Sequence, residues 1–160
     1  MKKRASKPFT VIVFVLAAAV VAFAFIHSAM PADLSDSESE NVLDFLTSFL
    51  RAIGISAELT DYMVRKAAHF AEYTAMGMLF TSCAYCFDRP RFYRFTPHIM
   101  LAGLLTAVID ETIQLGTEGR AALITDVWLD FAGIVTGYAV MLVVYIVYLR
   151  LKIRGSKGIV

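Results

Sequence analysis

Charged residues are scarce in this sequence, and so are cysteine and proline. Only 18% of the 160 residues are charged, whereas 58% are hydrophobic and the mean hydropathy is +0.64. A soluble domain is nearer a quarter charged, so the composition excludes an ordinary soluble enzyme and favours an integral membrane protein. The two cysteines, Cys83 and Cys86, lie inside an apolar stretch, which excludes a disulfide-rich secreted scaffold. The basic residues form short flanks beside apolar runs, a pattern that argues against nucleic-acid binding.

Four apolar runs have the length of membrane-spanning helices, which need about 20 residues each. They cover residues 9–26, 67–87, 98–115 and 127–149. The first run follows basic residues, as a signal peptide would, but it is longer than a usual signal core and lacks a good cleavage site. We therefore predict an all-α integral membrane bundle of four transmembrane helices, without an appended soluble enzyme.

The distribution of basic residues predicts the orientation of this bundle. Eleven of the 15 lysines and arginines lie before the first run, between the second and third runs, or after the fourth. Residues 31–40, between the first two runs, are instead acidic and rich in serine. Because loops rich in lysine and arginine stay in the cytoplasm, we predict a multi-pass protein with both termini cytoplasmic.

Two further segments are predicted at the membrane surfaces. In residues 41–53, apolar side chains recur at helical spacing between polar ones, which predicts a short extracytoplasmic amphipathic helix. Interfacial packing is the preferred role for this helix, and a lid over a site is the alternative. Near the cytoplasmic edge of the second and third spans, an aromatic belt is predicted from Tyr85, Phe92, Tyr93 and Phe95.

Polar and ionisable residues gather at one end of the last three predicted spans. In chain order they are Arg65, Lys66, His69, Glu72, Tyr73, Asp110, Glu111, Gln114, Arg120, Asp126 and Asp130. The second span runs inward and the third runs outward, so all of these residues fall near the extracytoplasmic side. Ionisable groups inside a membrane are costly, face the bundle interior and usually mark function. We therefore predict that these residues form one binding site in the outer half of the bundle.

Helical spacing places small residues in line with the polar ones. One stripe on the third span contains Gly103, Ala107, Asp110 and Gln114, and one on the fourth contains Asp126, Asp130, Gly133 and Gly137. Small residues at this spacing indicate surfaces where helices approach closely. The polar groups are therefore expected to face neighbouring helices rather than lipid.

The predicted site carries more negative than positive charge, with five carboxyl groups against three lysine and arginine side chains. Such a cluster in a poorly solvated place needs a cationic His69, protonated carboxyl groups or a bound cation. His69 and Glu72 are the candidate acid–base pair, with Asp110 and Glu111 as further catalytic candidates. A divalent metal on these residues is the less favoured alternative, because nitrogen and sulfur ligands are few.

The ordered motifs resemble those of the VanZ-like family of bacterial membrane proteins. The matching segments are Arg65-Lys66-x-x-His69-Phe70-x-Glu72-Tyr73, Asp110-Glu111-x-x-Gln114, Arg120 and Asp126-x-x-x-Asp130-x-x-Gly133-x-x-x-Gly137. In the last of these blocks, asparagine is common in the family where this chain has Asp130. Each motif is short, but the ordered set on separate helices is specific.

This resemblance covers roughly residues 35–137 and implies a bacterial cell-envelope protein, in a family whose founding member is associated with low-level teicoplanin resistance. It divides the chain into a basic flank (residues 1–8), a four-span membrane domain (9–149) and a basic tail (150–160). Beside membrane lipid, the expected partners are a cell-wall precursor, an envelope lipid or a glycopeptide, which the site would bind or protect. An intramembrane enzyme using His69 and Glu72 is the second hypothesis, and a structural scaffold is the third.

Overall fold

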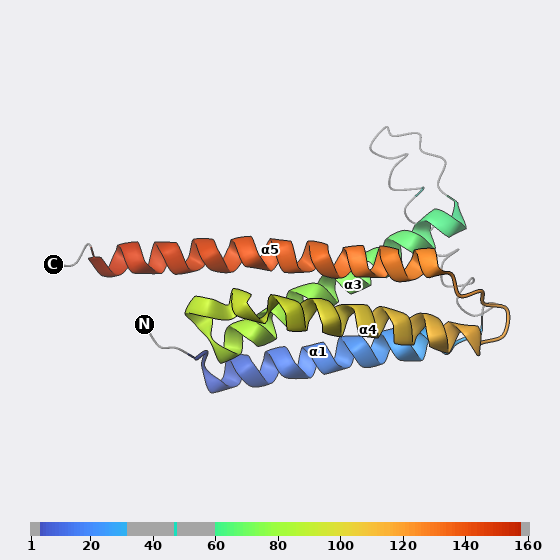
Figure 1. Ribbon diagram of the computed structural model, residues 1–160, viewed down its shortest axis with the longest axis horizontal. Helices are drawn as coiled ribbons and strands as arrows, with labels where there is room; N and C mark the ends of the chain where they lie inside the picture. Colours follow the sequence, from blue (N-terminus) through green and yellow to red (C-terminus); the bar gives the residue numbers. More distant parts are fainter. Residues whose placement is uncertain (1–3, 32–46, 48–59, 158–160) are drawn as a thin grey trace.

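The computed structural model describes residues 4–31, 47 and 60–157, with side chains as far as residue 154. Four long helices account for most of them (Figure 1): α1 (Lys7–Ser28), α3 (Asp61–Phe87), α4 (Thr96–Leu115) and α5 (Ile124–Lys157). A short 3-10 helix, η1 (Arg89–Phe95), joins α3 to α4, and the described ranges contain no strand. The predicted all-α bundle is confirmed.

Local sequence signals explain where these helices begin. Thr60 precedes α3, and its hydroxyl oxygen accepts a hydrogen bond from the Met63 amide at 3.3 Å, which satisfies a free N–H of the first turn. Pro8 and Pro97 lie in the first turns of α1 and α4, where a missing N–H does no harm. The connection between α4 and α5 turns at Gly119, whose φ of 75° suits a residue without a Cβ atom.

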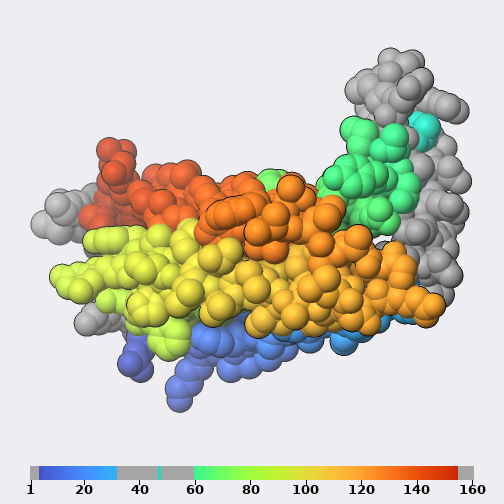
Figure 2. Space-filling view, turned by 45° about the vertical axis from the view of Figure 1, so that its right-hand side comes forward, coloured from blue at the N-terminus to red at the C-terminus, as the bar shows by residue number. Residues whose placement is uncertain are grey.

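The helices form an elongated bundle with two different ends (Figure 1). α1, α4 and α5 follow its long axis, whereas α3 crosses it obliquely and packs mainly against α5 and α1. The chain termini and η1 lie at one end. At the other end α1 finishes, α3 begins and α4 connects to α5, and we call this the polar end. Figure 2 shows the start of α3 rising beyond the surface of α4 and α5 there.

Glycine residues permit the close approach of α3, α4 and α5. A Cβ atom on Gly133 would lie 2.8 Å from the carbonyl oxygen of Phe70, and one on Gly137 would overlap the α3 backbone. On α4, a Cβ atom on Gly103 would lie 2.8 Å from Cγ1 of Ile134. The predicted contact surfaces of the third and fourth spans are therefore confirmed as sites of close helix packing.

An aromatic cluster packs the end of the bundle opposite the polar end. The rings of Tyr85 and Tyr145 stack with centroids 3.8 Å apart, and Phe92 packs edge-on against both. Tyr85 and Phe92 are only 3% and 1% exposed, so the predicted aromatic belt is wrong for these two residues. The reason is that η1 packs against α3 and buries Phe92, whereas Tyr93 stays 51% exposed.

Among the residues that the structure describes, three segments are long and apolar enough to cross a membrane: Lys7–Ser28, Arg89–Leu115 and Ile124–Arg154. α3 has 27 residues, enough to span about 40 Å, but its polar and ionisable residues make it less apolar than the others. It packs mainly against α5 and α1. The predicted amphipathic helix at 41–53 lies outside the described residues, apart from Thr47.

Candidate functional site

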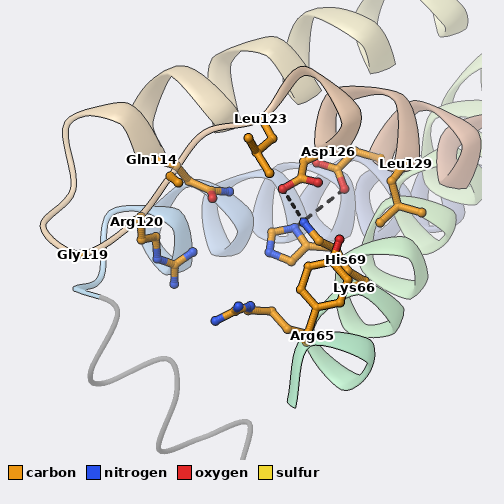
Figure 3. A pocket seen from close by; sticks show the side chains of 12 residues that line it. Arg65, Lys66, His69, Gln114, Gly119, Arg120, Leu123, Asp126 and Leu129 are labelled. Carbon is orange, nitrogen blue, oxygen red and sulfur yellow. Dashed lines mark ion pairs between the residues drawn. The ribbon is translucent and has the colours of Figure 1, made fainter. Parts of the chain in front are cut away.

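A cavity of about 290 Å³ opens at the polar end of the bundle (Figure 3). The start of α3, the end of α4, the α4–α5 connection and the first turns of α5 all contribute side chains to its wall. The lining residues are Tyr62, Arg65, Lys66, His69, Gln114, Gly119, Arg120, Ala121, Leu123, Asp126, Leu129 and Asp130.

Most of the residues predicted from the motifs meet in this cavity. Seven of the eleven line it, namely Arg65, Lys66, His69, Gln114, Arg120, Asp126 and Asp130. The other four are not part of its wall. Tyr73, Asp110 and Glu111 are buried in the bundle, and Glu72 is half-buried. The sequence therefore predicted the convergence of the helices but not which side chains face the cavity.

Two pairs of basic and acidic side chains join α3 to α5 across the cavity (Figure 3). The Lys66 ammonium group forms an ion pair with the Asp126 carboxylate, and both side chains are mostly buried. One helical turn deeper, Nδ1 of His69 lies 3.7 Å from Oδ1 of Asp130, too far for a hydrogen bond. The carboxylate paired with His69 is thus Asp130 rather than Glu72, which was the partner expected from the sequence.

Asp110 is held in place by side chains of α1 and α4. The Ser28 hydroxyl donates a hydrogen bond to Oδ1 of Asp110 at 2.7 Å, and Nε2 of Gln114 donates one to Oδ2 at 3.3 Å. The Thr117 hydroxyl in turn donates to the Ser28 carbonyl oxygen at 3.1 Å. These bonds fix the orientation of a carboxyl group that is only 1% exposed.

The α4–α5 connection is fastened to the helices on both sides of it. The Arg120 guanidinium donates a hydrogen bond to the His27 carbonyl oxygen at 3.2 Å, at the end of α1. The backbone amide of Leu123 donates to Oε2 of Glu111 at 3.1 Å, on α4. Glu111 therefore positions this loop, and Arg120 belongs both to the loop support and to the cavity wall.

Several buried polar atoms near the cavity have no hydrogen-bond partner among the described residues. They are both carboxylate oxygens of Asp130, one oxygen each of Glu72 and Glu111, and the hydroxyl of Tyr73. Such atoms are rare in folded proteins and call for an explanation, such as a bound ion or water. Those of Asp130 stand out, because Asp130 is completely buried.

One group of side chains has the arrangement of a metal-binding set. Ligand atoms of His69, Asp110 and Asp130, from three different helices, all lie within 4.8 Å of one another. The metal set considered from the sequence contained His69 and Glu72 with a further carboxylate such as Asp110 or Glu111, and it did not include Asp130. Neither glutamate belongs to the group that the structure brings together.

Sequence reasoning missed Ser28, because a single serine just beyond an apolar run forms no motif. It also missed Tyr62, whose ring lies 5.2 Å from the Lys66 ammonium group. Here a signal existed: Tyr62 lies four residues before Lys66, so both share a helical face. The apolar lining residues Leu123 and Leu129 carried no signal of their own.

The apolar helices and the buried ionisable cluster define a multi-pass helical membrane protein with a polar cavity at one end. A family model described as VanZ/LLP1 matches residues 12–147, and the chain belongs to this family. The resemblance inferred from the motifs is thereby confirmed. No curated protein and no solved structure gives a significant match to the chain.

Proposed function

We propose that the cavity at the polar end binds the anionic headgroup of an envelope lipid or of a lipid-linked cell-wall precursor. The observation that carries this proposal is the cavity itself, which holds Arg65 and Arg120 at the end of apolar helices. Arginine presents a planar fork of N–H donors that matches phosphate and carboxylate groups. Figure 3 shows both arginine side chains extending into the same space from α3 and from the loop.

The position of the cavity along the bundle suits a lipid ligand. Its wall is built at the ends of three helices, where lipid headgroups meet the hydrocarbon region. Arg89, Arg91 and Arg94 lie at the opposite end, together with both chain termini. By the positive-inside rule that opposite end is cytoplasmic, so the cavity opens to the outer leaflet, where cell-wall precursors are used.

Lipid binding to the purified full-length protein tests the proposal. Native mass spectrometry in detergent would compare phosphatidylglycerol, a polyprenyl phosphate and inorganic phosphate with phosphatidylcholine, a zwitterionic lipid without net charge, as the reference. We expect the anionic lipids to bind preferentially, and Arg65→Gln or Arg120→Gln to weaken binding about tenfold, equivalent to about 1.4 kcal/mol. Preference for the polyprenyl phosphate over phosphatidylglycerol identifies a precursor as the ligand.

The matched control is Arg94→Gln, an exposed arginine at the opposite end of the bundle. It removes the same charge without touching the cavity. If Arg94→Gln weakens binding as much as Arg120→Gln, the lipids respond to overall charge and the cavity is not their site. If the parent protein binds phosphatidylcholine as well as it binds the anionic lipids, the cavity does not select an anionic headgroup.

Teicoplanin resistance is the physiological consequence that we propose for this binding. A protein that covers the headgroup of a cell-wall precursor would keep a glycopeptide antibiotic from reaching it. Bacteria expressing the parent chain should tolerate more teicoplanin than bacteria expressing Arg120→Gln at equal protein levels. If both strains are equally susceptible to teicoplanin although the parent protein binds the lipid, the protein binds headgroups without conferring resistance.

An acid–base enzyme is the second candidate, and the pairing of His69 with Asp130 supports it. His69 lines the cavity with its imidazole oriented toward a carboxylate, as a general base requires. Incubating the protein with envelope lipids and analysing them by mass spectrometry would reveal a His69-dependent product. A binding protein leaves the lipids unchanged.

A further inference from the structure

We propose that His69, Asp110 and Asp130 bind a divalent transition-metal cation beside the polar cavity. The three residues come from α3, α4 and α5, and their ligand atoms lie within 4.8 Å of one another. This inference goes beyond the proposed headgroup binding, since the ion would be bound whether or not a lipid enters. Two independent observations support it: the burial of Asp130 without hydrogen-bond partners among the described residues and the way Asp110 is held.

The charge of the cluster calls for a cation. Asp130 is 0% exposed, and neither of its carboxylate oxygens has a hydrogen-bond partner among the described residues. Asp110 is a second carboxyl group, 1% exposed, on the neighbouring helix. When both carboxyl groups are ionised, one imidazole cannot neutralise them, and an uncompensated buried charge is strongly unfavourable. A divalent cation between them would compensate both.

Asp110 has the supporting bonds that metal-binding carboxylates usually have. Ser28 donates to Oδ1 and Gln114 donates to Oδ2, at 2.7 and 3.3 Å. Each carboxylate oxygen has two lone pairs, so one on each oxygen stays available for a metal. Hydrogen bonds of this kind orient ligands and commonly contribute to metal affinity.

The spacing of the ligand atoms fits a single ion after a small adjustment. An ion with bonds of about 2.1 Å separates opposite ligands by about 4.2 Å and neighbouring ligands by about 3–3.5 Å. The three ligand atoms lie within 4.8 Å of one another, so side-chain movements of less than about 1 Å bring all of them onto one ion. His69 and Asp130 also line the cavity, so water or an anionic ligand can reach the remaining coordination positions.

The ligand set of two carboxylates and one imidazole is compatible with Mn²⁺. Carboxylates suit Mg²⁺, Ca²⁺ and Mn²⁺, and Mn²⁺ is the transition metal among these three ions. Zn²⁺ would compete, although its structural sites normally contain more nitrogen or sulfur ligands. Mn²⁺ also gives an electron paramagnetic resonance signal, which makes it the practical probe.

Binding of Mn²⁺ to the full-length protein in detergent tests the proposal. After treatment with EDTA and dialysis, the loss of the free Mn²⁺ signal gives the stoichiometry and affinity, and thermal unfolding gives a second readout. We expect one Mn²⁺ per chain and a higher unfolding temperature with Mn²⁺ than without it. Asp130→Asn and His69→Gln should each weaken the affinity about 100-fold or more, whereas Glu118→Gln, an exposed carboxylate in the α4–α5 connection, should not.

Asp130→Asn also shows whether a loss of binding reflects the ligand or the fold. It removes a buried carboxylate that has no hydrogen-bond partner among the described residues, so the metal-free variant should unfold at the same or a higher temperature than the metal-free parent. Binding of no Mn²⁺ by the parent, or equal binding by Asp130→Asn, overturns the proposal. So does a metal-free Asp130→Asn protein that is less stable than the parent, because Asp130 would then be paired with a protonated His69.

Discussion

Ser28 shows how strongly a single uncharged residue can influence this site. Its hydroxyl is the closest hydrogen-bond donor to the Asp110 carboxylate, yet it comes from a helix that carries none of the predicted site residues. The two residues are 82 positions apart in the chain. Replacing the serine would leave a buried carboxylate oxygen with one donor fewer.

We predict that Ser28→Ala lowers the free energy of unfolding by about 1–3 kcal/mol, the usual cost of leaving a buried acceptor unsatisfied. Thermal or denaturant unfolding in detergent measures this change. Thr112→Val is the matched control, because the exposed Thr112 hydroxyl bonds only to the Val108 carbonyl oxygen of its own helix. A Ser28→Ala protein as stable as Thr112→Val would show that the Asp110 carboxyl group does not depend on this bond.

The Lys66–Asp126 ion pair gives a second prediction at the residue scale. Because these side chains are only 21% and 14% exposed, water screens their attraction poorly. We expect Lys66→Met and Asp126→Asn to be each destabilising and their combination to cost less than the sum, with a coupling on the order of 1 kcal/mol. Unfolding of both single variants and the double variant measures the coupling.

The Arg65–Asp61 pair offers a comparison within the same helix. Its atoms are 3.8 Å apart and its side chains are about a third exposed, so its coupling should be smaller. Equal coupling for the two pairs would mean that burial at the polar end contributes nothing to the strength of the Lys66–Asp126 pair.

At the scale of the helices, the crossing of α3 and α5 brings the site together. Gly133 and Gly137 let α5 approach the α3 backbone, and Asp130 lies about one turn before Gly133 on the same helix face. The same close contact that packs the helices also buries Asp130 against α3. A wider crossing would separate Asp130 from His69.

We therefore predict that Gly137→Ala destabilises the protein by about 1–3 kcal/mol, because the new methyl group would overlap the α3 backbone. Gly116→Ala is the control, since a Cβ atom there would meet only the Ile113 carbonyl oxygen, at an ordinary distance of 3.5 Å. Unfolding in detergent compares the two. Equal stabilities would indicate that α3 and α5 can separate without loss.

The spacing of glycines predicted this crossing, whereas the burial of Tyr85 and Phe92 could not be predicted. Small residues four positions apart report directly on helix contact. An aromatic residue at the end of a span, by contrast, is equally suited to the membrane interface and to the protein core. Which of the two Tyr85 and Phe92 occupy depends on the path of η1, which no local sequence pattern specifies.

At the scale of the whole molecule, the separation of the polar cavity from the chain termini makes the membrane topology testable. The termini and η1 lie at one end and the polar cavity at the other. We predict that reporter fusions near Arg91 and at Ser156 are cytoplasmic and that one at Thr117 is external, because the basic loops should remain inside. Activity of cytoplasmic and periplasmic reporters gives the answer. An external reporter at Ser156 with a cytoplasmic one at Thr117 would place the cavity in the inner leaflet.

The motifs predicted that the ends of three helices would meet, because alternating spans bring every second loop to the same side. The motifs did not show which side chains line the cavity wall and which are buried in the interior of the bundle. His69 and Asp130 line the cavity while Glu72 does not, although His69 and Glu72 lie on the same side of α3 by sequence spacing. The oblique path of α3 decides this difference, and it follows from tertiary packing rather than from local pattern.

The attachment of α1 to the polar end bears on whether this helix can be removed or replaced without harm to the site. Ser28 and the His27 carbonyl oxygen bind Asp110 and Arg120, so the last turn of α1 is part of the site's support. An export leader could be cleaved away or replaced by any hydrophobic sequence of similar length. Here either event would remove the α1 hydrogen-bond partners of Arg120 and Asp110, so we expect the site to depend on the sequence at the end of α1.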